Sequence, residues 1–137
     1  MIRLTGIERV FPVGDEEVHA LRGVDLAIGA GEYLSIMGPS GSGKSSLLNI
    51  IGLLDRPNGG RYELDERNVT ALSDDELARV RRDKIGFVFQ FFHLVPRLTA
   101  AQNIELPMVL AGIDPAERSR RLDALLAEYG LIDRAGH

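Results

Sequence analysis

The chain contains no cysteine, and no run of apolar residues long enough to cross a membrane. The absence of cysteine excludes a disulfide framework and any zinc or redox site built on cysteine. A membrane-spanning helix needs roughly 18 consecutive apolar residues, so an activity at a membrane would require a partner. The opening MIRLTGIERV also lacks the basic-then-apolar pattern of a signal peptide.

An excess of positive charge is missing as well. The 16 Lys and Arg residues are outnumbered by 20 Asp and Glu residues, which gives a formal net charge of -4. No overall basic field therefore exists to hold nucleic acid, and we expect no nucleic-acid partner. The one local basic run, RVRRDK at residues 79–84, is interpreted as a solvated helix face. With 137 residues, the chain is long enough for one modest domain with a real core.

The order of apolar segments and turn signals predicts an α/β protein with an antiparallel, strand-rich beginning. Strands are predicted at residues 2–11, 22–28, 32–37, 61–64 and 85–90. A turn is predicted at 12–17, and a buried helix over 47–54 is followed by the turn sequence RPNGG.

Three further helices are predicted from their capping residues. Two sites match the capping box, Ser73 with Glu76 and Thr99 with Gln102. A third helix is expected to begin after Asp114, with Pro115 at its first position. Its apolar stripe is read as packing rather than as a cofactor site, and consists of Leu122, Leu125, Leu126 and Tyr129.

Residues 38–46, GPSGSGKSS, fit the phosphate-loop pattern G-x-x-x-x-G-K-S/T at every fixed position. Glycines allow a tight turn and a close approach of the backbone to an anion, and the following helix adds free N–H groups. Lys44 would bind phosphates, and the Ser45 hydroxyl would bind Mg²⁺. A flexible linker is disfavoured, because the loop lies between two apolar segments. The expected phosphate-binding residues are Gly38, Pro39, Ser40, Gly41, Ser42, Gly43, Lys44, Ser45 and Ser46.

The class of nucleotide-binding protein follows from the rest of the chain. A GTPase should carry an N-K-x-D motif, which is absent, and RVRRDK is a poor candidate for the basic lid of a kinase. The sequence resembles the nucleotide-binding domain of an ABC transporter, and is most similar to the branch that serves lipoprotein release and macrolide or peptide export. The segments that carry the resemblance are IRLTGIERVF, VHALRGVDLAIGAGEYLSIMGPSGSGKSSLLNIIGLLDRPNGG, IGFVFQFFHLVPRLTAAQNIELPM and AEYGLIDRAGH.

The resemblance implies roles for individual residues. Phe11 stands where the family stacks an aromatic ring on adenine, and Val18 and Ala20 would line the same pocket. Lys44 and Gln90 would act in catalysis, with Gln90 joining Ser45 as a ligand of Mg²⁺. Two structural interpretations remain as alternatives to these roles: Phe11 could be a core residue at a strand end, and Gln90 a polar residue that ends a strand.

The resemblance also implies a fold, partners and a location. The expected fold is a P-loop NTPase core of ABC type with an N-terminal antiparallel β-subdomain, within residues 1–90, and a partial helical subdomain at residues 91–137. The family works as a homodimer on the cytoplasmic face of the inner (plasma) membrane. Its membrane-spanning subunits would meet residues 93–103, His93 to Asn103.

Parts that the family needs for ATP hydrolysis are not found in residues 1–137. There is no LSGGQ signature, no apolar strand leading into Asp-Glu, and no switch histidine. Leu64-Asp65-Glu66 follows a polar segment, and His137 lies at the end of the sequence. We therefore expect a truncated domain that is poorly stable and does not hydrolyse ATP alone. A non-catalytic binding module and a non-functional remnant remain as alternatives.

Overall fold

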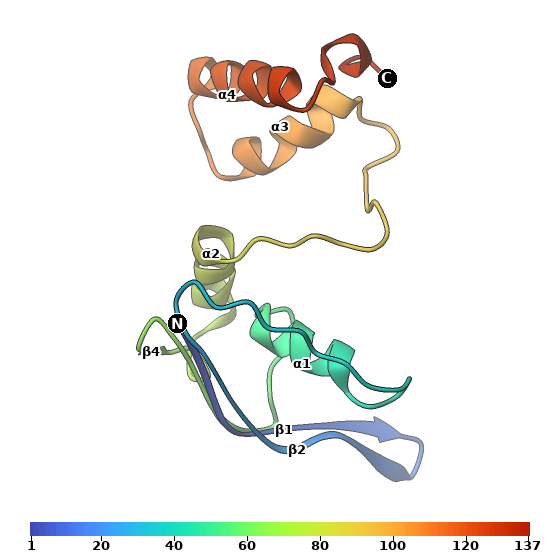
Figure 1. The fold of residues 1–137 in the computed structure, drawn as a ribbon, viewed down its shortest axis with the longest axis vertical. Coiled ribbons are helices and arrows are strands. Elements are labelled where there is room, and N and C mark those ends of the chain that lie inside the picture. The colour runs from blue at the N-terminus through green and yellow to red at the C-terminus, as the bar shows by residue number, and fades with distance from the viewer. The chain divides into compact units, whose positions relative to one another are not determined.

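The computed structural model describes residues 1–137, and its N-terminal part is a long antiparallel hairpin (Figure 1). β1 (Ile2–Val13) pairs with β2 (Glu16–Ile28), and the pairing continues to Val13 opposite Glu16. The strands predicted at 2–11 and 22–28 are confirmed. The turn predicted at 12–17 is wrong in its extent, because Gly14 takes a positive φ of 63° and reverses the chain in a tight turn.

The hairpin belongs to a four-stranded sheet with the order β2-β1-β3-β4. β3 (Gly59–Leu64) and β4 (Arg67–Asn68) form a second, shorter hairpin, and every pairing in the sheet is antiparallel. This confirms the predicted antiparallel β-subdomain. α1 (Lys44–Ile51) and α2 (Asp74–Lys84) contribute to its core. The buried core residues are Leu4, Ile7, Leu21, Ile50, Leu53, Tyr62, Leu64, Val69 and Leu77.

The strands predicted at 32–37 and 85–90 are wrong, because neither segment is paired in a sheet. A strand requires a neighbour for its backbone N–H and C=O groups, and no other segment of the chain offers one to either. Several of their apolar side chains are exposed: the exposed fraction is 93% for Tyr33 and 87% for Met37, and Val88 is fully exposed. Ile85, in contrast, packs against the core. Both segments have the composition of buried strands, but neither belongs to the four-stranded sheet.

α1 begins three residues before its predicted start at residue 47, directly at the end of the glycine loop. Gly43 has a φ of 86° and occupies the N-cap position, so the helix starts with Lys44. The helix ends at Ile51 rather than at residue 54, because Gly52 caps it and Leu53 takes a positive φ of 55°.

The capping predictions for the other helices are confirmed. Ser73 and Thr99 both form complete capping boxes, at the starts of α2 and of α3 (Ala100–Leu110). α4 (Pro115–Glu128) begins after Asp114, which accepts a hydrogen bond of 2.9 Å from the Ala116 amide. α3 packs against α4, and a 3₁₀ turn (Ile132–Arg134) follows. In the α4 stripe Leu126 is buried, whereas Tyr129 is 68% exposed.

The chain divides into two compact units, Met1–Phe87 and Val88–His137. The first contains the sheet with α1 and α2, and the second contains α3 and α4. The subdomain boundary predicted from the sequence lies a few residues further along, after Gln90. None of the helices is both long enough and apolar enough to span a bilayer.

The turn between β3 and β4 carries a pH-sensitive ion pair. Asp65 accepts hydrogen bonds from the Met1 ammonium at 2.8 Å and from Lys84 Nζ at 3.0 Å. These two bonds, followed by the attraction of the two charges, lower the pKa of Asp65 from its ordinary value of 3.8 to about 2. A carboxyl group whose pKa is lower in the folded state stabilises the fold when it is ionised.

We therefore expect Asp65 to stabilise the fold fully above pH 3.8 and to lose this contribution as the pH falls toward 2. The measurement is the free energy of unfolding against pH for the protein and for Asp65→Asn. The two curves should converge as the pH falls through this window. A separation that stays constant over the same range would contradict the expectation.

Candidate nucleotide-binding site

The glycine loop is shaped by two residues that need a left-handed backbone. Gly41 has a φ of 80° and Gly43 a φ of 86°, which side-chain-bearing residues rarely adopt. A Cβ at Gly43 would lie 2.4 Å from the carbonyl oxygen of Ala20, so the loop approaches β2 too closely for any other residue. The loop is thereby fixed against the hairpin.

The first turn of α1 presents N–H groups to this loop. Helix N-termini leave these groups without intrahelical partners. No side chain caps α1, and no acidic residue lies in its first turn. The positive end of the helix dipole is therefore not neutralised by the protein, which favours an anion at this place.

Lys44 lies folded back over the loop. Its ammonium group donates to the carbonyl oxygens of Gly38 at 2.9 Å and Pro39 at 2.6 Å, and to Ser42 Oγ at 3.3 Å. These acceptors are uncharged and belong to exposed residues. Phosphate oxygens are stronger, charged acceptors, so they could replace them.

A pocket of about 340 Å³ joins this loop to the hairpin. Its lining is Phe11, Val18, His19, Ala20, Ser40, Gly41, Ser42, Gly43, Lys44, Ser45 and Ser46. Phe11 and Val18 are cross-strand partners, which explains how residues from two strands reach the same pocket. The structure thus places Phe11, Val18 and Ala20, the predicted base-binding residues, next to the predicted phosphate loop.

Two groups of predicted residues lie outside this pocket. Gly38 and Pro39 do not line it, but their carbonyl oxygens hold Lys44. Gln90 belongs to the second unit, and its role as a catalytic residue and magnesium ligand stays a prediction.

His19 also lines the pocket, although no motif in the sequence points to it. A strict two-residue alternation places His19 on the opposite face from Val18 and Ala20. The register of β1 against β2 shifts between Arg9, which pairs with Leu21, and Val10, which pairs with His19. Such a bulge depends on the partner strand, so the alternation of the sequence alone gives no signal for it.

The donors at the loop suit a phosphate better than a metal ion held by protein ligands alone. Nowhere in the chain do three or more His, Asp or Glu side chains gather in a way that could hold a metal. Mg²⁺ commonly keeps several waters and binds through substrate phosphates together with one or two protein oxygens. The Ser45 hydroxyl, in the first turn of α1, fits that limited role.

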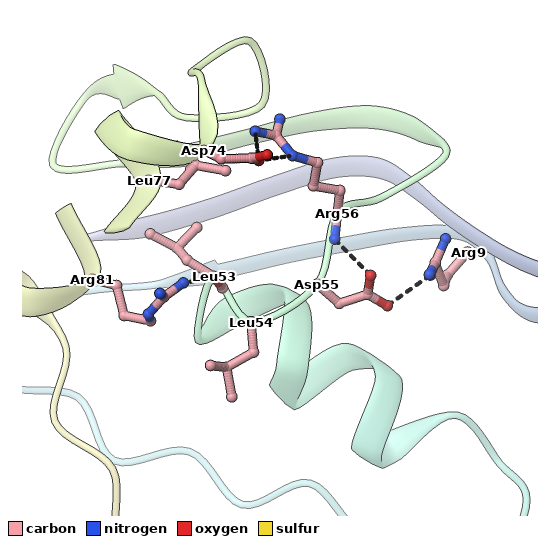
Figure 2. A pocket seen from close by; sticks show the side chains of 8 residues that line it. All are labelled: Arg9, Leu53, Leu54, Asp55, Arg56, Asp74, Leu77 and Arg81. Atoms are coloured by element: carbon pink, nitrogen blue, oxygen red, sulfur yellow. Dashed lines mark hydrogen bonds and ion pairs between the residues drawn. The ribbon is translucent and has the colours of Figure 1, made fainter. Parts of the chain in front are cut away.

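A second, larger hollow of about 440 Å³ lies beside α2 (Figure 2). Its charged side chains already pair with one another or with backbone: Arg9 with Asp55, Arg56 with Asp74, and Arg81 with the carbonyl oxygen of Leu53. Two of its three arginines are neutralised by carboxylates, and no glycine loop lines it. The smaller pocket at the glycine loop is therefore the better candidate, although it is not the largest.

Comparison with known proteins places the chain in a family. Residues 21–137 match the sequence profile of the ABC transporter family. The macrolide export ATP-binding/permease protein MacB of Marinobacter nauticus is 51% identical over the whole chain, which covers 21% of that protein. The uncharacterized ABC transporter ATP-binding protein YknY of Bacillus subtilis is 50% identical, and the chain covers 60% of it.

A solved structure agrees with these relatives. The ATP-binding cassette MJ0796, a dimer in a post-hydrolysis state bound to ADP and Pi, superimposes with a TM-score of 0.88 at 45% identity. The match covers the whole chain and 61% of the cassette. The chain belongs to the ABC transporter family and has the fold of the N-terminal part of its ATP-binding cassette. It spans between about a fifth and three fifths of the length of these relatives.

Proposed function

We propose that this chain binds Mg·ATP as part of the ATPase subunit of an ABC transporter, which couples ATP binding and hydrolysis to the export or extraction of a substrate. The observation that carries the proposal is the single pocket that joins the glycine loop to Phe11. The size of about 340 Å³ is within the range of small-molecule sites. The relatives support the class of activity, since one is named for macrolide export and another was solved with ADP and Pi.

Different residues of the pocket bind the phosphates and the base of the nucleotide. The N–H groups of the loop and of the first turn of α1 hold the phosphates, and Lys44 leaves the carbonyl oxygens of Gly38 and Pro39 to bind them. Phe11 stacks on the adenine, with Val18 and Ala20 at its side. Ser45 and Gln90 are the protein ligands for Mg²⁺, which neutralises phosphate charge when it is bound.

The second unit offers a surface for a membrane-spanning partner. Phe91, Phe92 and Leu94 are 70%, 89% and 63% exposed. The two phenylalanines directly precede the segment His93 to Asn103, and Leu94 lies within it. Neighbouring apolar side chains in solvent are typical of an interaction site. We place the complete protein on the cytoplasmic face of the inner membrane, bound there through this segment, and as a dimer like MJ0796.

Residues 1–137 by themselves do not turn over ATP in this proposal. No Asp or Glu lines the pocket, so no carboxylate is placed there to act as a general base or to orient the attacking water. The experiment measures steady-state ATP hydrolysis by the full-length encoded polypeptide, by its Lys44→Ala variant, and by residues 1–137. We expect hydrolysis only from the first. Turnover by residues 1–137 above the Lys44→Ala background would contradict the proposal.

The lack of a carboxylate in the pocket also favours a second candidate, a binding module that holds nucleotide without turnover. The same experiment separates the two functions. A full-length polypeptide that binds Mg·ADP but hydrolyses no ATP would support the binding module and exclude the ATPase.

A further inference from the structure

The ring of Phe11 has a cation over one of its faces. The guanidinium carbon of Arg9 lies 4.3 Å from the ring centroid. The two residues are two positions apart on β1, so their side chains lie on the same face of the sheet. Phe11 lines the pocket at the glycine loop, whereas Arg9 lines the larger hollow beside it. Arg9 therefore covers one face of the Phe11 ring, and only the opposite face is available for stacking with a bound base.

Arg9 is itself held from two sides. Its Nε donates to Asp55 Oδ2 at 2.7 Å, and its Nη1 donates to Asn58 Oδ1 at 3.0 Å. The other Asp55 oxygen accepts from the Arg56 amide at 2.8 Å, so the carboxylate is fixed as well (Figure 2). The side chains of Arg9 and Asp55 are only 21% and 27% exposed, which limits competition from water.

Asn58 ties the same group to the backbone of β1. Its Oδ1 also accepts from the Val10 backbone N–H at 2.9 Å, and the backbone N–H of Asn58 donates to the carbonyl oxygen of Glu8 at 2.8 Å. Asn58 thus bonds to the residues on both sides of Arg9. The guanidinium group is held by a rigid frame and not by one exposed ion pair.

The frame is continuous with the helix of the phosphate loop. The amides of Leu54 and Asp55 both donate to the carbonyl oxygen of Asn49 in α1, at 2.8 and 3.2 Å. α1 begins at the loop that would hold the phosphates. Asp55, four positions after the helix ends at Ile51, holds the cation behind Phe11.

We propose that Arg9 is a positioning residue for the nucleotide base: held by Asp55 and Asn58, it fixes the ring of Phe11 in the orientation on which the base stacks. The inference rests on the proposed function, in which Phe11 binds the base. Arg9 does not touch the nucleotide and acts only through the ring. It therefore contributes to the part of the affinity that depends on the base, and not to the part that depends on the phosphates.

The experiment measures dissociation constants for Mg·ADP and for inorganic pyrophosphate with the full-length polypeptide. We expect Arg9→Ala to weaken Mg·ADP binding by about three- to tenfold, the range of a cation–π contact. Pyrophosphate binding should be unchanged, because pyrophosphate has no base. In a Phe11→Ala background, Arg9→Ala should have no further effect, since the ring through which Arg9 acts is gone.

Two further variants serve as controls for the Arg9→Ala measurement. Arg9→Lys keeps the charge but loses the planar fork that reaches two acceptors, so its Mg·ADP affinity should fall between those of wild type and Arg9→Ala. It also tests the inference if Arg9→Ala does not fold. Arg3→Ala removes an exposed arginine from the same strand and should bind both ligands like wild type.

The outcomes separate the inference from the proposed function. Equal weakening of ADP and pyrophosphate by Arg9→Ala overturns the inference, as does a full effect of Arg9→Ala in the Phe11→Ala background. If Phe11→Ala weakens Mg·ADP but neither Arg9 variant does, the inference alone fails. If Phe11→Ala leaves Mg·ADP affinity unchanged, the proposed role of Phe11 fails, and the inference fails with it.

Discussion

Replacing Lys44 with alanine lowers the affinity for Mg·ADP by about 100-fold in the full-length polypeptide, while the melting temperature barely changes. Hydrogen bonds to charged groups contribute about 1.5–3 kcal/mol each, and about 1.4 kcal/mol corresponds to a tenfold change in affinity. The affinity should depend on Lys44 because, in the proposed site, its ammonium supplies the positive charge of the phosphate loop. The stability of the fold should not depend on Lys44. The lysine binds the carbonyl oxygens of Gly38 and Pro39, and water can solvate these oxygens instead because both residues are exposed.

The matched control for this variant is the chain's other lysine. Lys84 pairs with Asp65 at a turn that does not line the pocket, so Lys84→Ala makes the same change of charge elsewhere. Titration calorimetry with Mg·ADP should show wild-type affinity for Lys84→Ala. Equal affinities for Lys44→Ala and Lys84→Ala would mean that the loop does not bind the phosphates.

The second large effect is expected at Gly43. In Gly43→Ala, the new Cβ would lie 2.4 Å from the carbonyl oxygen of Ala20 and 3.1 Å from Leu21 Cδ2. A left-handed conformation costs a non-glycine residue about 1–2 kcal/mol, and crowding in a packed site costs about 1–3 kcal/mol more. We expect the free energy of unfolding to fall by about 3 kcal/mol, and Mg·ADP affinity to fall with it, because the start of α1 must move away from β2.

Gly41 is the control that isolates the close approach. It has a similar φ of 80°, but a Cβ there would meet nothing within 4 Å. Gly41→Ala should therefore show only the conformational cost, about 1–2 kcal/mol, in chemical denaturation. If the two variants were equally stable, the contact between the loop and β2 would not matter for the fold.

The features of the chain that are local could be predicted from the sequence. A capping box involves residues three positions apart, so Ser73 with Glu76 and Thr99 with Gln102 located the starts of α2 and α3. The phosphate loop is equally local, because its glycines, its lysine and the helix that follows are adjacent in the chain. These features require no knowledge of distant partners.

Several features that depend on distant partners could not be predicted. Residues 32–37 and 85–90 have the composition of buried strands, but a strand exists only where another strand pairs with it, and here none does. The cation behind Phe11 depends on Asp55 and Asn58, which lie 46 and 49 positions from Arg9. The place of His19 in the pocket coincides with a shift of strand register that its neighbours in sequence do not reveal.

The most direct test of the account is the structure of the full-length polypeptide with bound Mg·ADP. We expect Lys44 Nζ to leave the carbonyl oxygens of Gly38 and Pro39 and to bind the β-phosphate, which should lie against the N–H groups at the start of α1. The adenine should stack on the face of Phe11 opposite Arg9. A bound nucleotide with Lys44 still on the two carbonyl oxygens, or with its base away from Phe11, would contradict the account.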